Sequence, residues 1–280
     1  MDLTIYNKDS SRMSEIKSGT IDLIITSPPY WNLKDYEHPE QLGLNLSYKQ
    51  YLYQLKKHFY ECMRVLKEDA FICINVGDIR SGRYKETGRP RLYSLQSDII
   101  NFFTEEMDFD LFQHFIWEKL GVKKGAKSTI IYGSVGKGGY KDFGFPPFLY
   151  TDLLTEHILV FRKPGNRKRD VIDRLKEQSL NLIPKEILKE WLHPIWKINS
   201  LKHISHKATF PDEIAIRLIR LFSLENETVL DPFSGTGTTL RNAIELGRNA
   251  IGYELNANYI NELIKFHKLT QEGDKYYNRN

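Results

Sequence analysis

Ser27-Pro28-Pro29-Tyr30 follows a run of apolar residues and combines a hydroxyl, two rigid residues and an aromatic ring. The Ser27 oxygen can accept a hydrogen bond from an amino group. Proline fixes φ, so the carbonyl of Pro28 is held as a second acceptor, and Tyr30 offers a flat face for stacking. The four residues therefore predict a clamp for a planar amine. The alternative is a Pro-Pro turn at the end of a strand.

A second segment, Asp231-Pro232-Phe233-Ser234-Gly235-Thr236-Gly237-Thr238-Thr239, joins an expected strand to an expected helix. Glycine lets the backbone approach a ligand closely, and the helix that follows carries partial positive charge at its start. Glu254 stands 23 residues after Asp231, at the end of the next strand, where an acid can bind both ribose hydroxyls of a nucleoside. No lysine follows the glycines, which argues against a phosphate-binding P-loop.

The two segments together resemble the amino-group DNA methyltransferases, which methylate an exocyclic amine of a base. The order of the segments resembles the beta-ordered group of that family. The resemblance implies an α/β, Rossmann-like S-adenosylmethionine-dependent methyltransferase fold, with a mostly parallel seven-stranded sheet and one antiparallel strand. His206-Lys207-Ala208-Thr209-Phe210-Pro211 resembles the family segment that completes the methionine end of the cofactor pocket. The expected cofactor is S-adenosyl-L-methionine, and no metal site is assigned. The expected cofactor-binding residues are Asp9, Phe210, Asp231, Phe233, Ser234, Gly235, Thr236, Gly237, Thr238 and Glu254.

The first residue of the tetrad indicates the base. Cytosine-N4 enzymes of the family mostly have serine there and adenine-N6 enzymes mostly have aspartate, so Ser27 favours cytosine. Adenine-N6 methylation, RNA or protein methylation, and a nucleic-acid-binding module without catalysis remain alternatives. Methylation of the cytosine ring carbon needs a thiolate, typically after a proline, and neither Cys62 nor Cys73 follows one. A target amine inside a duplex is paired, so the base must be flipped out. Trp31 and the aromatics of 132–148 are candidates to line its pocket.

Basic residues are concentrated in three stretches. Residues 119–141 hold six lysines and no acid, residues 162–169 hold five Arg or Lys and no acid, and residues 80–91 hold five against one Glu. Such stretches are typical of phosphate contacts, so we expect double-stranded DNA as the partner; solvated loops are the alternative. The expected DNA-binding residues are Arg80, Arg83, Lys123, Lys124, Lys127, Lys137, Arg167, Lys168 and Arg169.

Apolar periodicity predicts the elements that position these residues. Strands are expected over 3–6, 22–26, 70–76, 109–117, 156–162, 228–230 and 249–253. Helices are expected near 13–18, over 47–66 with Ser47 as a cap, and over 94–107, 211–224, 238–246 and 256–269. Strands that alternate with helices imply a mostly parallel sheet covered on both faces.

The length of 280 residues favours one catalytic domain over residues 1–280. Residues 164–198 break the alternation and predict a small helical insertion, with helices near 171–178 and 185–192, as the candidate segment for target recognition. A cognate restriction endonuclease is a possible partner, and the chain is expected to be a monomer or homodimer. No signal peptide or membrane-spanning run is seen, so a cytoplasmic protein is expected.

Overall fold

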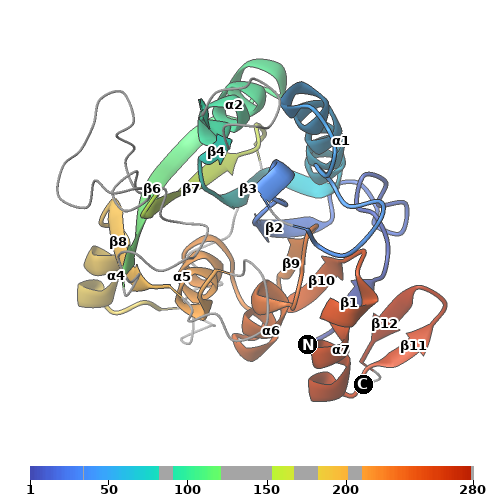
Figure 1. The fold of residues 1–280 in the computed structure, drawn as a ribbon. Helices are drawn as coiled ribbons and strands as arrows, with labels where there is room; N and C mark the ends of the chain where they lie inside the picture. Colours follow the sequence, from blue (N-terminus) through green and yellow to red (C-terminus); the bar gives the residue numbers. More distant parts are fainter. Residues whose placement is uncertain (34, 82–90, 121–152, 167–181, 201–209, 279–280) are drawn as a thin grey trace.

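The computed structural model describes residues 1–33, 35–81, 91–120, 153–166, 182–200 and 210–278. A central sheet runs through it in the order β11-β12-β1-β10-β9-β2-β3-β7-β6-β8 (Figure 1). The bounds, in that order, are Thr270–Glu272, Lys275–Tyr277, Leu3–Tyr6, Asn249–Tyr253, Thr228–Asp231, Ile21–Thr26, Leu66–Val76, Thr155–Arg162, Asp110–Leu120 and Ile195–Asn199.

The seven strands from β1 to β6 in that order confirm the predicted mostly parallel sheet with one reversed strand. β7 pairs antiparallel with both β3 and β6, while β1, β10, β9, β2 and β3 are parallel neighbours. Three further strands extend the sheet beyond the expected seven: β8 pairs parallel with β6, and the β11–β12 hairpin pairs with β1. A separate hairpin is formed by β4 (Ile79–Ser81) and β5 (Arg91–Tyr93).

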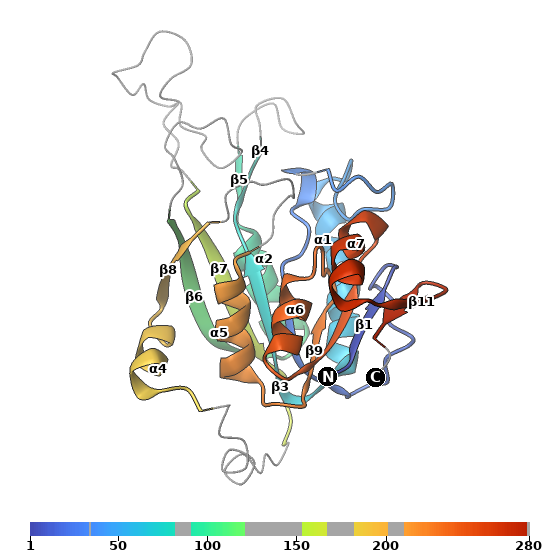
Figure 2. The ribbon, with the colours of Figure 1, turned by 90° about the horizontal axis from the view of Figure 1, so that it is seen from below.

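Helices cover both faces of the sheet (Figures 1 and 2). α1 (Tyr48–Val65) and α2 (Leu95–Asn101), which continues as a π-helical turn over Phe102–Glu106, pack on one face. α5 (Asp212–Phe222), α6 (Thr238–Glu245) and α7 (Ala257–His267) pack on the other. Two short helices, a 3-10 turn over Trp31–Leu33 and α4 (Lys185–Trp191), complete the described set.

Local sequence explains most of these elements. In α1, Tyr51, Leu55, Phe59 and Cys62 form a buried stripe at helical spacing. The predicted cap at Ser47 is confirmed: its hydroxyl accepts from the Gln50 amide, and the Gln50 side chain accepts from the Ser47 amide at 2.9 Å. β2 is buried along its whole length because it lies at the centre of the sheet.

The last part of the expected helical insertion at 164–198 differs from the prediction. The helix near its end is present as α4, but residues 195–199 form β8, which pairs with β6 over five residues from Ile116 to Leu120. That final part therefore belongs to the main sheet. The expected helix at 171–178 lies outside the described residues.

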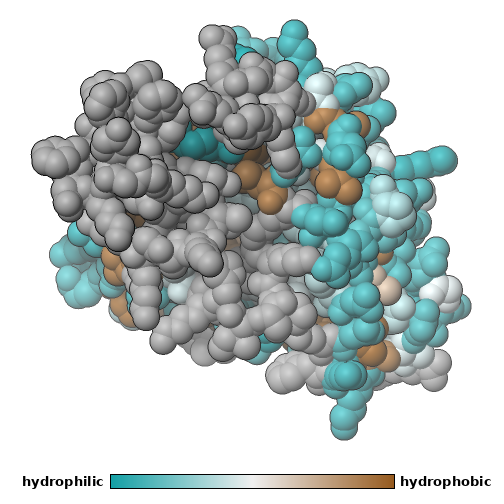
Figure 3. Space-filling view, in the orientation of Figure 1, coloured by the Kyte–Doolittle hydropathy of each residue, from teal (hydrophilic) through white to brown (hydrophobic). Residues whose placement is uncertain are grey.

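The coloured surface in Figure 3 is mainly hydrophilic, with small hydrophobic groups between. Among the described residues, no helix is long and apolar enough to cross a membrane.

Candidate active site and cofactor pocket

The tetrad and the glycine-rich loop start from neighbouring strands at the centre of the sheet. β2 leads into Ser27, and β9 ends at Asp231. From β9 the chain continues through α6 to β10 on one side, and from β2 it continues through α1 to β3 on the other. The point where the direction of connection reverses is where open α/β sheets bind ligands, at the carboxyl ends of the strands.

Asp231 ties these two strands together. Its carboxylate accepts from the Thr26 hydroxyl at 2.8 Å, the Thr239 hydroxyl at 2.7 Å and the Phe233 amide at 3.1 Å. Burial raises the pKa of Asp231 to about 6, although the three hydrogen bonds oppose that shift. The geometry gives Asp231 an organising task, because its oxygens already bind donors from β2, the loop and α6.

The two glycines of the loop have different surroundings. Gly235 has φ +52°, and a Cβ placed there would meet no atom within 4 Å, so a ligand can approach its backbone. Gly237 has φ +82°, and a Cβ there would lie 2.0 Å from the Leu263 side chain on α7. Gly237 also immediately precedes α6, as its N-cap. The missing side chain at Gly237 therefore makes room for α7, whereas at Gly235 it leaves open space.

Glu254 follows β10 and lies beside the same loop. Its carboxylate accepts from the Gly235 amide at 2.9 Å and the Asn256 amide at 2.8 Å. Burial raises its pKa, against the effect of these bonds. The two bonds fix the carboxylate at the pocket wall, close to the glycine that leaves open space.

The third wall comes from the N-terminal segment and α1. Ser10 lies 2.9 Å from Nδ1 of His58, and Asp9 lies 3.8 Å from Nε2 of the same ring. The His58 ring packs against Phe233 with centroids 4.9 Å apart. Burial lowers the pKa of His58, so the neutral ring is favoured. Asp9 also caps its own turn by accepting from the Ser11 amide at 2.6 Å.

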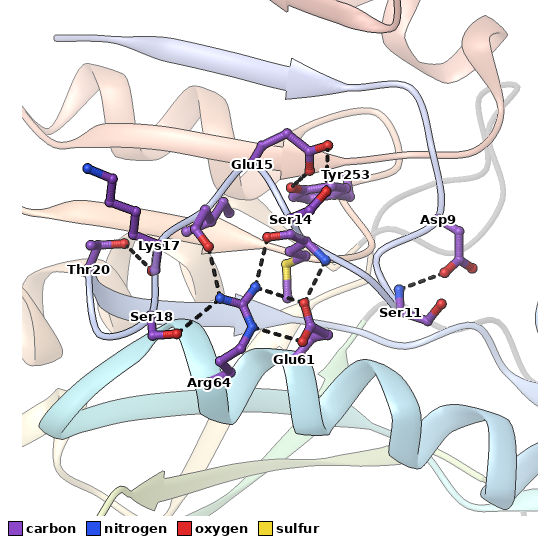
Figure 4. A network of polar contacts seen from close by, with 12 residues as sticks. Asp9, Ser11, Ser14, Glu15, Lys17, Ser18, Thr20, Glu61, Arg64 and Tyr253 are labelled. Carbon is purple, nitrogen blue, oxygen red and sulfur yellow. Dashed lines mark hydrogen bonds and ion pairs between the residues drawn. The ribbon is translucent and has the colours of Figure 1, made fainter.

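Two residues of α1 hold this N-terminal segment (Figure 4). The Arg64 guanidinium donates to the carbonyls of Met13 and Ile16, and Glu61 accepts from the Met13 amide at 2.6 Å. The helix predicted near 13–18 is wrong, since residues 13–18 form turns. Backbone groups that a helix would bond internally are bonded to α1 instead.

Two tyrosine hydroxyls form hydrogen bonds with the backbone of the tetrad. Tyr51 on α1 donates to the Pro29 carbonyl at 2.8 Å, and the Tyr30 amide donates to the Tyr36 hydroxyl at 3.3 Å. Burial, and then the nearby Glu156 carboxylate, raise the pKa of Tyr30. Ser27 and Glu156 lie near the Tyr30 hydroxyl, yet neither forms a hydrogen bond of ordinary geometry with it, and no other described residue does.

All these walls enclose one cavity of about 1030 Å³, measured with its open mouth. The predicted residues that line it are Asp9, Ser27, Pro28, Pro29, Tyr30, Phe210, Asp231, Phe233, Ser234, Gly235, Thr236, Thr238 and Glu254. Gly237 does not line it. A fixed acid beside an open glycine and an aromatic wall fit a nucleoside cofactor with a charged amino-acid tail.

The cavity includes residues that the sequence did not single out. They include Ser10, Tyr36, His58, Tyr253, Asn256 and Tyr259. His58 lies on the apolar stripe of α1, where a polar residue among Leu55, Phe59 and Cys62 was a usable signal. The expectation that Trp31 lines the pocket is wrong: Trp31 is buried against Tyr48 and Tyr93 and donates to the Leu46 carbonyl.

Of the predicted DNA-binding residues, Arg80 alone lies in the described part of the chain, on β4 and half-buried. The others, Arg83, Lys123, Lys124, Lys127, Lys137, Arg167, Lys168 and Arg169, lie outside it, as do the aromatics of 132–148.

A protein-family model described as DNA methylase, covering N6 and N4 methyltransferases, matches residues 21–265. The chain belongs to this DNA methylase family. It is 36% identical to the Type II methyltransferase M.MjaI of Methanocaldococcus jannaschii, over 91% of this chain and 89% of the relative. It is 30% identical to the Type II methyltransferase M.MthZI of Methanothermobacter thermautotrophicus, over 99% and 85%.

Solved structures agree with this assignment. TTHA0409 of Thermus thermophilus, assigned as a DNA modification methylase and complexed with S-adenosyl-L-methionine, superimposes with a TM-score of 0.70 at 28% identity, covering 94% of this chain and 91% of that one. The cytosine-N4-specific PvuII methyltransferase, at 18% identity and a TM-score of 0.64, is similar in fold, over 93% and 84%. This DNA methylase is thus an amino-group DNA methyltransferase that uses S-adenosylmethionine, as predicted.

Proposed function

We propose that this DNA methylase methylates the exocyclic N4 amine of cytosine in double-stranded DNA, as the modification enzyme of a restriction-modification system. The observation that carries the proposal is a tetrad headed by Ser27 in the same cavity as the Gly235 loop. Relatives named as Type II methyltransferases support the biological setting. A cognate endonuclease that cuts the same site, and a monomeric or homodimeric enzyme, belong to the same proposal.

S-adenosylmethionine supplies a methyl group activated by a positively charged sulfur. We assign Glu254 to its ribose hydroxyls and Asp9 to the adenine, with the His58–Phe233 wall beside it. The start of α6 faces the methionine carboxylate with partial positive charge, in line with the preference of helix N-termini for anions. The full proposed set is Asp9, Phe210, Asp231, Phe233, Ser234, Gly235, Thr236, Gly237, Thr238 and Glu254, with Asp231 and Gly237 acting through the shape of the loop.

The tetrad aligns the attacking amine. The Ser27 oxygen and the Pro28 carbonyl accept the two amine hydrogens, which directs the nitrogen lone pair towards the cofactor. Positive charge develops on that nitrogen as it attacks, so fixed acceptors stabilise the transition state more than the ground state. The methyl–sulfur bond would break as the carbon–nitrogen bond forms, with S-adenosylhomocysteine as the leaving group. No strong base is required, because the amine proton becomes acidic once the new bond forms and can pass through the hydrogen-bonded acceptor to water. Tyr30 stacks on the base.

The target base is flipped out of the duplex to reach this cavity. We propose that the basic stretches 80–91, 119–141 and 162–169 contact DNA phosphates, through Arg80, Arg83, Lys123, Lys124, Lys127, Lys137, Arg167, Lys168 and Arg169. Residues 164–194, ahead of β8, are the proposed segment for target recognition.

The decisive experiment is identification of the product. The protein is incubated with labelled S-adenosylmethionine and unmethylated genomic DNA, the DNA is digested to nucleosides, and the labelled nucleoside is identified by mass spectrometry. N4-methylcytosine is expected. Labelled N6-methyladenine alone would refute the cytosine assignment and retain the amino-methyltransferase chemistry. Sequencing the methylated DNA gives the recognition site.

A further inference from the structure

The loop between the tetrad and α1 contacts both halves of the cavity. It covers residues 35–46, after the 3-10 turn over Trp31–Leu33. The residues of this loop that line the cavity are Tyr36, His38, Gln41 and Leu42. Tyr36 forms hydrogen bonds with both the cofactor side and the tetrad, and it has no part in the chemistry proposed above.

The main chain of Tyr36 is bonded to the cofactor side through Asn256. Nδ2 of Asn256 donates to the Tyr36 carbonyl at 2.9 Å, while Oδ1 of Asn256 caps α7 by accepting from the Asn258 amide at 3.0 Å. The backbone amide of Asn256 donates to the Glu254 carboxylate, which also accepts from the Gly235 amide. The Tyr36 carbonyl is therefore linked, through one buried side chain, to the carboxylate that is assigned to the cofactor ribose.

The other backbone group of Tyr36 is bonded within the loop. The Tyr36 amide donates to Oε1 of Gln41 at 2.7 Å, and the Gln41 amide donates to the His38 carbonyl at 3.1 Å. Gln41 is only 8% exposed, so this turn is a packed part of the cavity wall. With its amide and its carbonyl both bonded, the Tyr36 main chain is a fixed point from which the side chain extends.

The Tyr36 hydroxyl contacts the tetrad at a single peptide group. Proline has no N–H, so Tyr30 supplies the first backbone donor after Ser27. That amide donates to the Tyr36 hydroxyl at 3.3 Å. The carbonyl of the same peptide group belongs to Pro29 and accepts from the Tyr51 hydroxyl at 2.8 Å. Two tyrosine hydroxyls thus bind the two polar ends of the Pro29–Tyr30 peptide.

The orientation of this peptide group determines where the functional groups of the tetrad lie. A peptide group is planar, so a rotation of it changes ψ of Pro29 and φ of Tyr30 together. The φ angle of Pro29 is fixed by its ring, which leaves ψ as the one soft torsion between this peptide and the Pro28 carbonyl. Holding the Pro29–Tyr30 peptide therefore holds the Pro28 carbonyl and the Tyr30 ring in one arrangement.

The two hydrogen bonds to this peptide group differ in length. The bond from Tyr51, on α1, is 2.8 Å, whereas the bond to Tyr36 is 3.3 Å and longer than the usual N–H···O distance of about 2.9–3.0 Å. Hydrogen bonds at active sites are often long in the free enzyme and shorten in the complex. The bonds that fix the Tyr36 main chain are already 2.7 and 2.9 Å long. The connection is therefore formed at the cofactor side and incomplete at the tetrad.

We propose that Tyr36 is a positioning residue that couples the cofactor half of the cavity to the tetrad. S-adenosylmethionine bound to Glu254 holds Asn256 and, through it, the main chain of Tyr36. The Tyr36 hydroxyl then fixes the Pro29–Tyr30 peptide in the arrangement that methyl transfer needs. The inference rests on the proposed function, since it assumes that the tetrad holds the target amine.

The first test removes the hydroxyl alone. Tyr36→Phe keeps the ring and both main-chain bonds, so calorimetric affinity for S-adenosylmethionine should stay within about twofold of wild type. The single-turnover rate of methyl transfer, at saturating cofactor and duplex DNA carrying the recognition site, should fall roughly threefold to tenfold, the range expected for one uncharged hydrogen bond. Tyr53→Phe, on α1 with a residue 66% exposed, is the control and should transfer at the wild-type rate. Thermal melting checks that both variants are folded.

The second test separates coupling from a local contact. Asn256→Ser keeps a side-chain oxygen that can cap α7 but loses the amide nitrogen that donates to the Tyr36 carbonyl. It should lower the single-turnover rate at least about threefold in the wild type and in Tyr53→Phe. In Tyr36→Phe it should lower the rate by less than about twofold further, because the hydroxyl that Asn256 positions is already absent.

Ser27→Ala is measured in parallel, so that two kinds of failure can be distinguished. If Ser27→Ala loses methyl transfer while folded Tyr36→Phe keeps the wild-type rate, the coupling is overturned and the proposed function stands. The same conclusion follows if the effects of Tyr36→Phe and Asn256→Ser multiply. Transfer at the wild-type rate by Ser27→Ala would overturn the proposed mechanism of the tetrad and this inference together.

Discussion

The two halves of the cavity treat their polar groups in opposite ways. On the cofactor side, the carboxylates of Asp231 and Glu254 accept hydrogen bonds from the chain itself. On the tetrad side, the Tyr30 hydroxyl is buried without a partner among the described residues, and so is Oδ1 of Asn75 on β3. Backbone and side chains thus complete the first half before any ligand arrives, whereas the second half keeps buried groups that no described residue bonds.

The difference follows from what each half must hold. The cofactor is the same in every turnover, so a preorganised loop serves it without reordering in each cycle. The target base comes from a duplex and must be told apart from three others. Under the proposed function, unmatched buried groups are suited to that selectivity, because a wrong base leaves them unpaired. The same groups lower the stability of the free protein.

The largest expected effect is a loss of methyl transfer, without a loss of cofactor binding, when the tetrad is changed. Ser27→Ala should lower the single-turnover rate of methyl transfer about a hundredfold or more, the scale seen when one fixed group that stabilises transition-state charge is removed. Affinity for S-adenosylmethionine, measured by calorimetry, should stay within about twofold of wild type. Transfer at the wild-type rate would mean that the tetrad is only a turn.

The next effect appears in stability against pH on the cofactor side. Folding raises the pKa of Asp231 from 3.8 to about 6, so the folded state holds this proton more tightly than the unfolded state. The contribution of Asp231 to stability is therefore greatest below pH 4 and declines as pH rises to 6, by about 3 kcal/mol. Asp231→Asn cannot titrate, so the stability difference between wild type and variant in cofactor-free urea unfolding should shift by about 2.4 kcal/mol between pH 4 and 7. A constant difference would contradict the assignment of a buried, titrating carboxylate.

Glu254 differs from Asp231 in lying beside the open backbone of Gly235. Glu254→Gln should weaken S-adenosylmethionine roughly tenfold to a hundredfold, as expected for loss of a charge-assisted contact. Glu225→Gln, a change in the turn that precedes β9 at the opposite end from Asp231, is the matched control and should bind the cofactor as wild type does. Equal affinities of the two variants for S-adenosylmethionine would show that the Glu254 carboxylate does not contact the cofactor.

The glycines sharpen the comparison within one loop. Gly237→Ala should destabilise the protein by about 1–3 kcal/mol, through strain at positive φ and the collision with Leu263. Gly235→Ala carries the strain of positive φ without a collision, so it should cost less stability and weaken cofactor binding more, because its methyl enters the cavity. Thermal melting ranks the stabilities of the two variants, and calorimetry ranks their affinities for S-adenosylmethionine. The reverse ranking in either measurement would contradict these roles.

The sequence predicted the parts of this site that depend on local chemistry. The glycine turn, the strand ends at Asp231 and Glu254 and the Ser47 cap depend on neighbours a few residues away. Other features needed partners that are distant in the chain. The turns over 13–18 depend on Arg64, and the role of Gly237 depends on Leu263. β8 became visible only through its pairing with β6, because its short alternation is bounded by helix-like residues.

The contact between Asn75, Lys119 and Glu156 could not be predicted from the sequence either. Asn75, Lys119 and Glu156 lie in three separate strands. Their polar groups meet because the strands are neighbours in the order β3-β7-β6 and β7 is reversed. Spacing in the sequence carries no trace of that order. The first residue of the tetrad indicates the base from family resemblance alone.

The smallest expected effect has the opposite sign in the two halves and so tests the comparison directly. Tyr30→Phe removes a hydroxyl that is buried without a described partner, so the free protein should be as stable as wild type or up to about 1 kcal/mol more stable. On the cofactor side, Thr239→Val removes a hydroxyl that donates to Asp231 at 2.7 Å, and it should destabilise by about 1–3 kcal/mol. A stability loss in Tyr30→Phe as large as that in Thr239→Val would show that both halves are completed by the chain itself, and the distinction between them would fail.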